Sequence, residues 1–275
     1  MNGKNSILLV DPEFDPNTAA DCQLLIRLGP DSFSYAIIDR NCNQLKAVYD
    51  QQECEDAAAN LEAAIRNDSY LKLPFESVKV AVYTENTIAV PQELLATMEP
   101  ASFSGYFNTA QTEVLYSHAE TSQNFSIVYN FNKKIEETLQ LLPGSRKFEQ
   151  TAPLLALATE QAPESLYLDF TPGSFHLGYL RGGKLVFNRY FEIENAEEFN
   201  YYLLLAIQQL EIDTMLTAVY LSGIVHEEDP IYQCIARSFS QVHFKKAEIE
   251  HIDCRLLEDM PAHYYSGLLA IALCG

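Results

Sequence analysis

The stretch LYLDFTPGSFHLGYL, residues 166–180, decides the fold of this chain. Its first six residues form an apolar strand pattern, and Pro172-Gly173-Ser174 is a turn signal that separates them from a second apolar run. Two such runs with a short turn between them predict an antiparallel β-hairpin. Gly182-Gly183 supplies the next turn, so a third strand is expected over 185–191. The stretch and its continuation therefore predict three consecutive antiparallel strands.

The hydrophobic period changes after the third strand. Apolar residues now recur every three or four positions, at Ala196, Phe199, Leu203, Ala206, Ile207 and Leu210. This spacing is typical of an amphipathic helix. A strand is expected over 217–222, and a helix that begins with proline over 230–239. The order of elements in this half is therefore β-β-β-α-β-α.

A similar order occurs about 140 residues earlier. The expected elements are strands over 24–28, 33–38 and 45–49, a helix over 54–65, a strand over 78–84 and a helix from Pro91. The sequence of residues 30–33, Pro-Asp-Ser-Phe, is also similar to Pro-Gly-Ser-Phe at 172–175. The chain is therefore predicted to be an α/β protein built from a duplicated β-β-β-α-β-α unit.

Two domains follow from this repeat. The first half is expected over residues 1–150 and includes an insertion around 101–124; the second half is expected over 151–275. The remaining elements are strands over 114–118, 125–131 and 147–150, and helices over 133–142, 153–158 and 264–274. The last of these helices is apolar, and we expect it to pack in a core because it is short and lacks basic flanks.

Composition excludes several classes of partner. The chain has 18 basic and 38 acidic residues, a formal charge of −20. Nucleic acids and anionic membranes bind clusters of Lys and Arg, so neither is expected as a partner. The apolar run 7–10 is too short for an export signal, and six cysteines without a C-x-x-C pair indicate reduced thiols. A cytoplasmic protein is expected.

Three short motifs carry a resemblance to a known fold. Residues 166–171 resemble the second phosphate-binding strand of the actin-like ATPases, and 219–223 resemble their adenosine motif. Residues 185–189 resemble a strand of the bacterial cell-division and pilus-assembly members. The duplicated unit resembles that of the actin-like ATPase (ribonuclease H-like) fold, which is shared by actin, sugar kinases and Hsp70-type chaperones. The whole chain resembles a bacterial family with this fold that is known by a domain-of-unknown-function label.

The resemblance implies a site for ATP and magnesium between the halves. It places phosphate-side contacts at Gly29, Ser32, Asp169, Thr171 and Ser174, and adenosine-side contacts at Ser222 and Gly223. In this fold, backbone N–H groups of two hairpin turns hold phosphates and an acidic residue holds hydrated Mg²⁺.

The sequence departs from that pattern in each motif. Arg27 stands where the resembling proteins have the first aspartate, and Pro30 and Pro172 enter the two phosphate turns without an N–H donor. Ile224 replaces the second glycine of the adenosine motif. We therefore expect a vestigial nucleotide pocket with no catalytic residue, no bound cofactor and no metal. We also expect an ion pair between Arg27 and Asp169.

Other groupings point weakly to chemistry. A set of metal-ligand types occurs near the end of the chain, at His243, Glu248, Glu250, His251, Asp253 and Cys254, but its spacing matches no helical His pair. No Gly-x-Ser-x-Gly elbow exposes a nucleophile. Tyrosines come in pairs at 201–202 and 264–265; one of each pair is either an exposed interface anchor or partly buried with a wet hydroxyl.

The expected function is that of a cytoplasmic scaffold or protein-interaction module. Its partner would be an unidentified protein, and a homodimer is an open alternative. A second hypothesis is a nucleotide-binding switch or weak ATPase that uses the Asp169 strand with ATP and magnesium. Binding of a different small ligand between the halves is a third.

Overall fold

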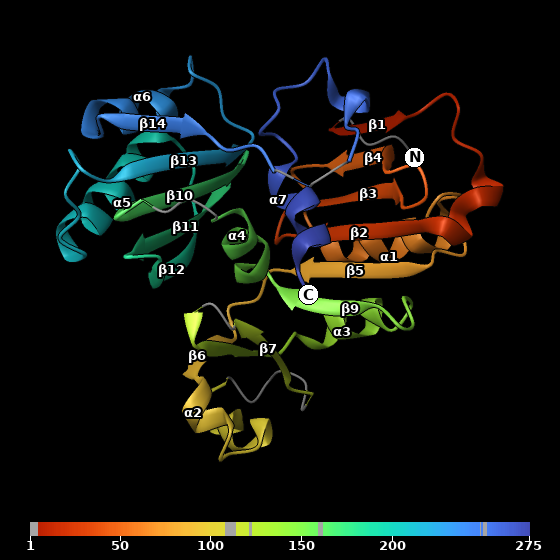
Figure 1. The fold of residues 1–275 in the computed structure, drawn as a ribbon, viewed down its shortest axis with the longest axis horizontal. Helices are drawn as coiled ribbons and strands as arrows, with labels where there is room; N and C mark the ends of the chain where they lie inside the picture. Colours follow the sequence, from red (N-terminus) through yellow and green to blue (C-terminus); the bar gives the residue numbers. More distant parts are fainter. Residues whose placement is uncertain (1–4, 108–113, 121–122, 159–161, 248, 250–251) are drawn as a thin grey trace. The chain divides into compact units, whose positions relative to one another are not determined.

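The computed structural model describes residues 5–107, 114–120, 123–158, 162–247, 249 and 252–275. The chain divides into two compact units. Unit 1 comprises residues 1–152 with Cys274, and unit 2 comprises 153–273 with Gly275. Each unit contains a mixed sheet with helices packed on it (Figure 1).

The main sheet of unit 1 has six strands in the order β1-β4-β3-β2-β5-β9. The strands are β1 (Ser6–Val10), β2 (Cys22–Leu28), β3 (Phe33–Asp39), β4 (Gln44–Gln51), β5 (Ser77–Val82) and β9 (Arg146–Glu149). Short turns make β2, β3 and β4 antiparallel neighbours, whereas β5 follows α1 (Ala57–Asn67) and pairs with β2 in parallel. The carboxyl ends of β2, β5 and β9 therefore lie at one edge of the sheet.

Helices α1 and α3 (Lys133–Leu139) cover one face of this sheet. Leu61 of α1 and Leu139 of α3 pack in one core with Leu24, Ile26 and Val80. Leu24 and Ile26 lie two positions apart in β2, as residues on one face of a strand do. At the far end of the chain, Cys274 accepts a hydrogen bond of 2.5 Å from Lys79 Nζ through its carbonyl oxygen.

A small second sheet forms the inserted part of unit 1. Its order is β6-β8-β7, with β6 (Thr87–Pro91), β7 (Tyr116–Glu120) and β8 (Phe125–Tyr129). The helix expected to begin at Pro91 starts one residue later and is short: Pro91 ends β6, and α2 (Gln92–Leu95) has four residues. The segment before this helix is an extended strand because Thr87, Ile88 and Val90 are β-branched and pair with β8.

The sheet of unit 2 has five strands in the order β12-β11-β10-β13-β14. The strands are β10 (Glu164–Thr171), β11 (Ser174–Arg181), β12 (Lys184–Glu192), β13 (Ala218–Gly223) and β14 (Gln241–Phe244). Its helices α5 (Ala196–Gln209) and α6 (Pro230–Ser238) come after β12 and β13. The strand order repeats β4-β3-β2-β5-β9 of unit 1, so the predicted duplicated unit is confirmed.

Both faces of the second sheet are covered. Phe199 and Leu203 of α5 pack with Leu168 and other residues of β10, β11 and β13. On the opposite face, Leu154 of α4 (Thr151–Leu157) packs with Tyr167 and Leu180.

The remaining apolar segment near the end of the chain forms α7 (Ser266–Leu269) and η5 (Ala270–Leu273), which is less regular than the helix expected over 264–274. Among the described residues, no helix has the length and apolar composition needed to cross a bilayer.

The start of α5 gives a first testable prediction. Asn195 caps this helix: its Oδ1 accepts hydrogen bonds of 3.0 Å from the backbone N–H groups of Glu197 and Glu198. Asn195→Ala removes the acceptor and is expected to lower the free energy of unfolding by about 1 kcal/mol. Asn195→Gly keeps a favourable capping backbone, so it should lower the free energy of unfolding by only a few tenths of a kcal/mol. Urea unfolding measures both losses. Equal losses for the two variants would contradict this account of the cap.

Candidate functional site

Asp169 and Ser222 meet on neighbouring strands of unit 2. The parallel pairing of β10 with β13 puts these two residues in register. Ser222 Oγ donates a hydrogen bond of 2.6 Å to Asp169 Oδ1, and both residues are buried. One oxygen of the carboxylate that the resemblance assigns to the magnesium side is therefore held by a protein hydroxyl.

The predicted phosphate turn of unit 2 joins β10 to β11. The hydroxyls of Thr171 and Ser174 hydrogen-bond to each other across it. Ser174 is fully buried, and the Gly173 carbonyl accepts a hydrogen bond of 2.9 Å from Ile193 N. Pro172 contributes no N–H donor. The polar groups named here are thus used within the protein.

Gly223 ends β13 in a conformation that only glycine adopts without strain. Its φ is +78°, and a Cβ at this position would lie 2.1 Å from the carbonyl oxygen of Phe170. The close approach lets Ile224 N donate a hydrogen bond of 3.0 Å to that oxygen. Gly223 N donates to His263 O at 3.0 Å, and Val225 N to Gly223 O at 3.1 Å. Three consecutive amides of the predicted adenosine loop therefore have protein acceptors.

The corresponding turn of unit 1 lies between β2 and β3. Gly29 N donates to Ser32 O at 2.8 Å, and Ser32 Oγ lies 3.3 Å from Asp31 Oδ1. Arg27, in β2, acts electrostatically on Asp50 of β4. Burial raises the pKa of the Asp50 carboxyl to about 6, and a hydrogen bond from Gln52 and the charge of Arg27 oppose that rise. The predicted ion pair between Arg27 and Asp169 joins residues of different units and stays a prediction.

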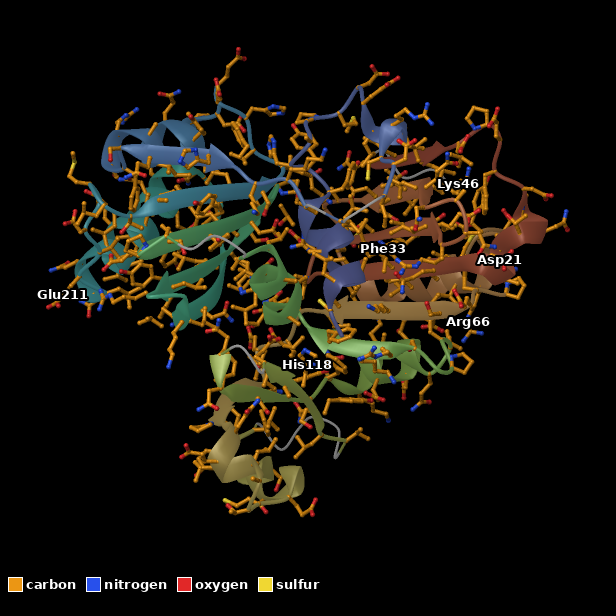
Figure 2. All side chains as sticks on the ribbon, viewed as in Figure 1. Asp21, Phe33, Lys46, Arg66, His118 and Glu211 are labelled. Atoms are coloured by element: carbon orange, nitrogen blue, oxygen red, sulfur yellow. The ribbon has the colours of Figure 1, made fainter. Side chains whose placement is uncertain are left out.

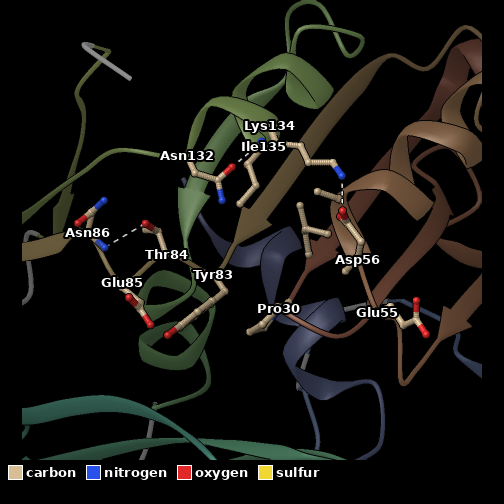
Figure 3. Close-up of a pocket in the computed structure, with 14 residues that line it drawn as sticks. Pro30, Glu55, Asp56, Tyr83, Thr84, Glu85, Asn86, Asn132, Lys134 and Ile135 are labelled. Atoms are coloured by element: carbon tan, nitrogen blue, oxygen red, sulfur yellow. Dashed lines mark hydrogen bonds and ion pairs between the residues drawn. The ribbon is translucent and has the colours of Figure 1, made fainter. Parts of the chain in front are cut away.

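A cavity of about 420 Å³ opens in unit 1 beside this turn (Figure 3). Its lining comes from the β2–β3 turn, the start of α1, the link after β5 and the start of α3; it comprises Leu28, Gly29, Pro30, Glu55, Asp56, Ala57, Ala58, Tyr83, Thr84, Glu85, Asn86, Asn132, Lys134 and Ile135. Lys134 reaches across to Asp56, and its hydrogen bond lowers the pKa of that carboxyl. Two residues of the predicted site belong to this turn. Gly29 lines the cavity, whereas Ser32 is buried and does not appear in its lining.

Glu149 is a distinctive buried residue that sequence reasoning missed. It ends β9 in register with Val82, and its Oε2 accepts a hydrogen bond of 2.9 Å from Thr151 N. Its side chain is buried, and Oε1 has no hydrogen-bond partner among the described residues. Burial raises the pKa of this carboxyl to about 7, and the hydrogen bond from Thr151 opposes the rise. An acidic residue at the end of a short strand, directly before a helix, was the available signal.

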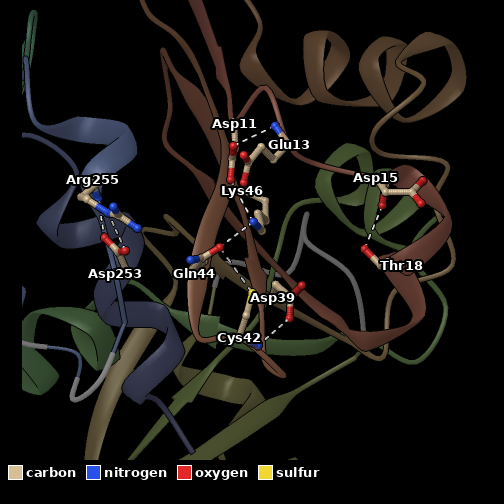
Figure 4. Close-up of polar contacts among 10 residues, drawn as sticks. All are labelled: Asp11, Glu13, Asp15, Thr18, Asp39, Cys42, Gln44, Lys46, Asp253 and Arg255. Carbon is tan, nitrogen blue, oxygen red and sulfur yellow. Dashed lines mark hydrogen bonds and ion pairs between the residues drawn. The ribbon is translucent and has the colours of Figure 1, made fainter.

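Three of the six metal-ligand types near the end of the chain fall outside the part that the structure describes. These are Glu248, Glu250 and His251. The described residues contain no group of three His, Cys, Asp or Glu side chains that could hold a metal ion. Asp253 instead accepts a hydrogen bond of 2.7 Å from Arg255 Nε (Figure 4). All six cysteines are described, and no disulfide joins any of them. Cys42, the exposed one, donates its backbone N–H to Asp39 at 3.1 Å.

The two units with one repeated strand order define an α/β protein with the actin-like ATPase fold, as the resemblance predicts. The chain belongs to the family described as "Protein of unknown function (DUF3822)", whose model matches residues 11–242. No curated protein matches the sequence.

Solved structures bear out the fold. A crystal structure from Bacteroides thetaiotaomicron, described as a protein with actin-like ATPase fold and unknown function, has a TM-score of 0.75 and 19% identity; the match covers 95% of this chain and 99% of that one. The PilM–PilN type IV pilus biogenesis complex gives 0.60 and 15%, covering 91% and 97%. The ethanolamine utilization protein EutJ from Carboxydothermus hydrogenoformans gives 0.53 and 9%, covering 97% and 93%. At these identities the likeness concerns the fold.

Proposed function

We propose that this protein is a non-catalytic, cytoplasmic member of the actin-like ATPase class, which serves as a scaffold or protein-interaction module. The observation that carries the proposal is the loop after β13. Its amides at Gly223, Ile224 and Val225 all donate to protein carbonyls, and Ile224 adds a branched side chain where the resembling proteins have glycine. These three donors are therefore not available to a purine.

The phosphate turns support the same proposal. Pro30 and Pro172 remove one donor from each turn, and the Thr171 and Ser174 hydroxyls satisfy each other. Asp169 already accepts a hydrogen bond from Ser222. These residues fit a magnesium nucleotide poorly, so no catalytic step is assigned to them.

One structural neighbour supports the interaction role. Its title places PilM in a complex with PilN, so that member of the fold assembles with another protein. Six cysteines without a disulfide or a C-x-x-C pair support a reducing compartment for the present chain.

Thermal unfolding of the full chain tests the proposal. We expect the same melting temperature with millimolar Mg-ATP, Mg-ADP or Mg²⁺ alone. A ligand at 100 times its dissociation constant would add about 2.7 kcal/mol and raise the midpoint by at least about 5 °C. A rise with nucleotide but not with Mg²⁺, lost in Asp169→Ala, would replace the proposal with the nucleotide-binding switch.

A further inference from the structure

Helix α5 presents a stripe of exposed apolar side chains to solvent. Tyr201, Leu204 and Leu205 are 61%, 50% and 38% exposed, and their spacing of three and four residues puts them on one face of the helix. Phe199 and Leu203 of the same helix are fully buried in the core of unit 2. The exposed stripe is therefore not required to hold the helix on its sheet.

The loop after the helix also exposes large apolar side chains. Met215 and Leu216 are 68% and 67% exposed. The loop begins at the last turn of the helix, where Ile212 N donates a hydrogen bond of 3.0 Å to Ile207 O. A group of large apolar side chains that faces water is a common mark of an interaction surface.

The charge around the stripe is mainly negative. No Lys or Arg occurs between Arg189 and Arg237, whereas acidic residues are frequent, at Glu192, Glu194, Glu197, Glu198, Glu211, Asp213, Glu227, Glu228 and Asp229. The nearby cation Arg181 already interacts with Glu164 at 3.2 Å and with the Leu210 carbonyl at 3.0 Å. Glu197 lies at the first turn of α5 and Glu211 just beyond its last (Figure 2), so each end of the helix has an exposed carboxylate.

This charge pattern decides between two occupants. Two copies of α5 packed against each other would bring acidic ends together, in a protein whose formal charge is already −20. Like charges placed together at an interface disfavour a complex. A partner with positive flanks gains from the same arrangement, and an exposed ridge at helical spacing suits another helix.

We propose that the outer face of α5 docks an amphipathic helix of a partner protein, with apolar residues on Tyr201, Leu204 and Leu205 and Lys or Arg side chains at its flanks. This inference rests on the proposed interaction function and identifies its surface and the chemistry of its partner. One tyrosine of the 201–202 pair is thereby the exposed anchor: Tyr201 faces solvent, whereas Tyr202 is half-buried against Phe191.

Three fluorescein-labelled synthetic helical peptides are the probes. One has leucines along one face and lysines at both ends, the second has glutamates in place of the lysines, and the third has alanines in place of the leucines. We expect fluorescence anisotropy to show binding of the lysine peptide to the full chain at least tenfold tighter than of either control. Equal affinities for the three peptides would contradict the proposal.

Leu204→Asp separates apolar docking from charge attraction. The variant adds a negative charge, so it would strengthen binding driven by charge alone, whereas docking predicts at least a tenfold loss. Leu94→Asp is the matched control, since Leu94 is 49% exposed on α2 in unit 1, and it should bind normally. Both variants should melt within about 2 °C of the wild type.

Two further readouts complete the test. Glu197→Lys with Glu211→Lys should lose the preference for lysine over glutamate flanks, which a binding site elsewhere would retain. A dimer seen in sedimentation velocity that Leu204→Asp dissociates would overturn the proposal, because a second copy would then occupy the face. A nucleotide response in thermal unfolding would refute the proposed function separately, since Leu204 takes no part in that assay.

Discussion

Gly223→Ala is expected to lower the free energy of unfolding by at least about 3 kcal/mol, and the melting temperature by roughly 6–12 °C. Two costs combine at this position. The φ of +78° is unfavourable for alanine, and the new methyl group would meet the backbone oxygen of Phe170 at 2.1 Å. That oxygen cannot turn aside as a flexible side chain could, because it accepts the hydrogen bond from Ile224 N. Thermal and urea unfolding measure the loss.

Gly183→Ala is the matched control for Gly223→Ala. Gly183 has nearly the same dihedral, φ +74°, but nothing lies within 4 Å of the position of its Cβ. We expect a loss of only about 1 kcal/mol, the cost of the backbone conformation alone. If the two variants lost equal stability, the close packing of β13 against β10 would not be the reason for the glycine.

Glu149 should make stability depend on pH between about 4.5 and 7. Burial raises the pKa of its carboxyl from 4.5 to about 7 in the folded protein. The folded state then holds a proton that the unfolded state has released, so the stability from this group is fully present below pH 4.5 and is lost as the pH rises through 7. A shift of this size corresponds to roughly 3 kcal/mol. Unfolding in urea across this pH range measures it.

Glu149→Gln isolates this contribution. The amide oxygen can still accept the hydrogen bond from Thr151 N, but the side chain no longer ionises. We expect the variant to exceed the wild type in stability at pH 8 and to match it near pH 4.5. Asp50, whose pKa burial raises to about 6, remains in both proteins and cancels in the difference. A difference that does not change with pH would contradict the assignment to Glu149.

The hairpins of both units could be predicted because their signals are local. The turn at 172–174 and the apolar runs beside it place β10 and β11 within two residues of their observed bounds. Strands β1 and β14 were missed because each is short and lies at a sheet edge, where pairing with β4 or β13 holds it in place. Such pairing depends on residues far away in sequence, which a local pattern does not contain.

The candidate site was predictable only in part for the same reason. Asp169 with Ser222, and Thr171 with Ser174, follow from strand register and turn length, and the structure brings each pair together. The cavity beside Gly29 also needs α3 and the link after β5, segments separated by many residues. Glu149 looks like an ordinary charged residue until burial is known.

The central claim is that the fold persists without nucleotide chemistry. Isothermal titration calorimetry of the full chain with Mg-ATP, at protein concentrations that detect a dissociation constant of 1 mM, tests it most directly. We predict no saturable heat, because the amides of the loop after β13 already donate to protein carbonyls and the phosphate turns contain Pro30 and Pro172. Saturable binding of one nucleotide that Asp169→Ala abolishes would contradict the account.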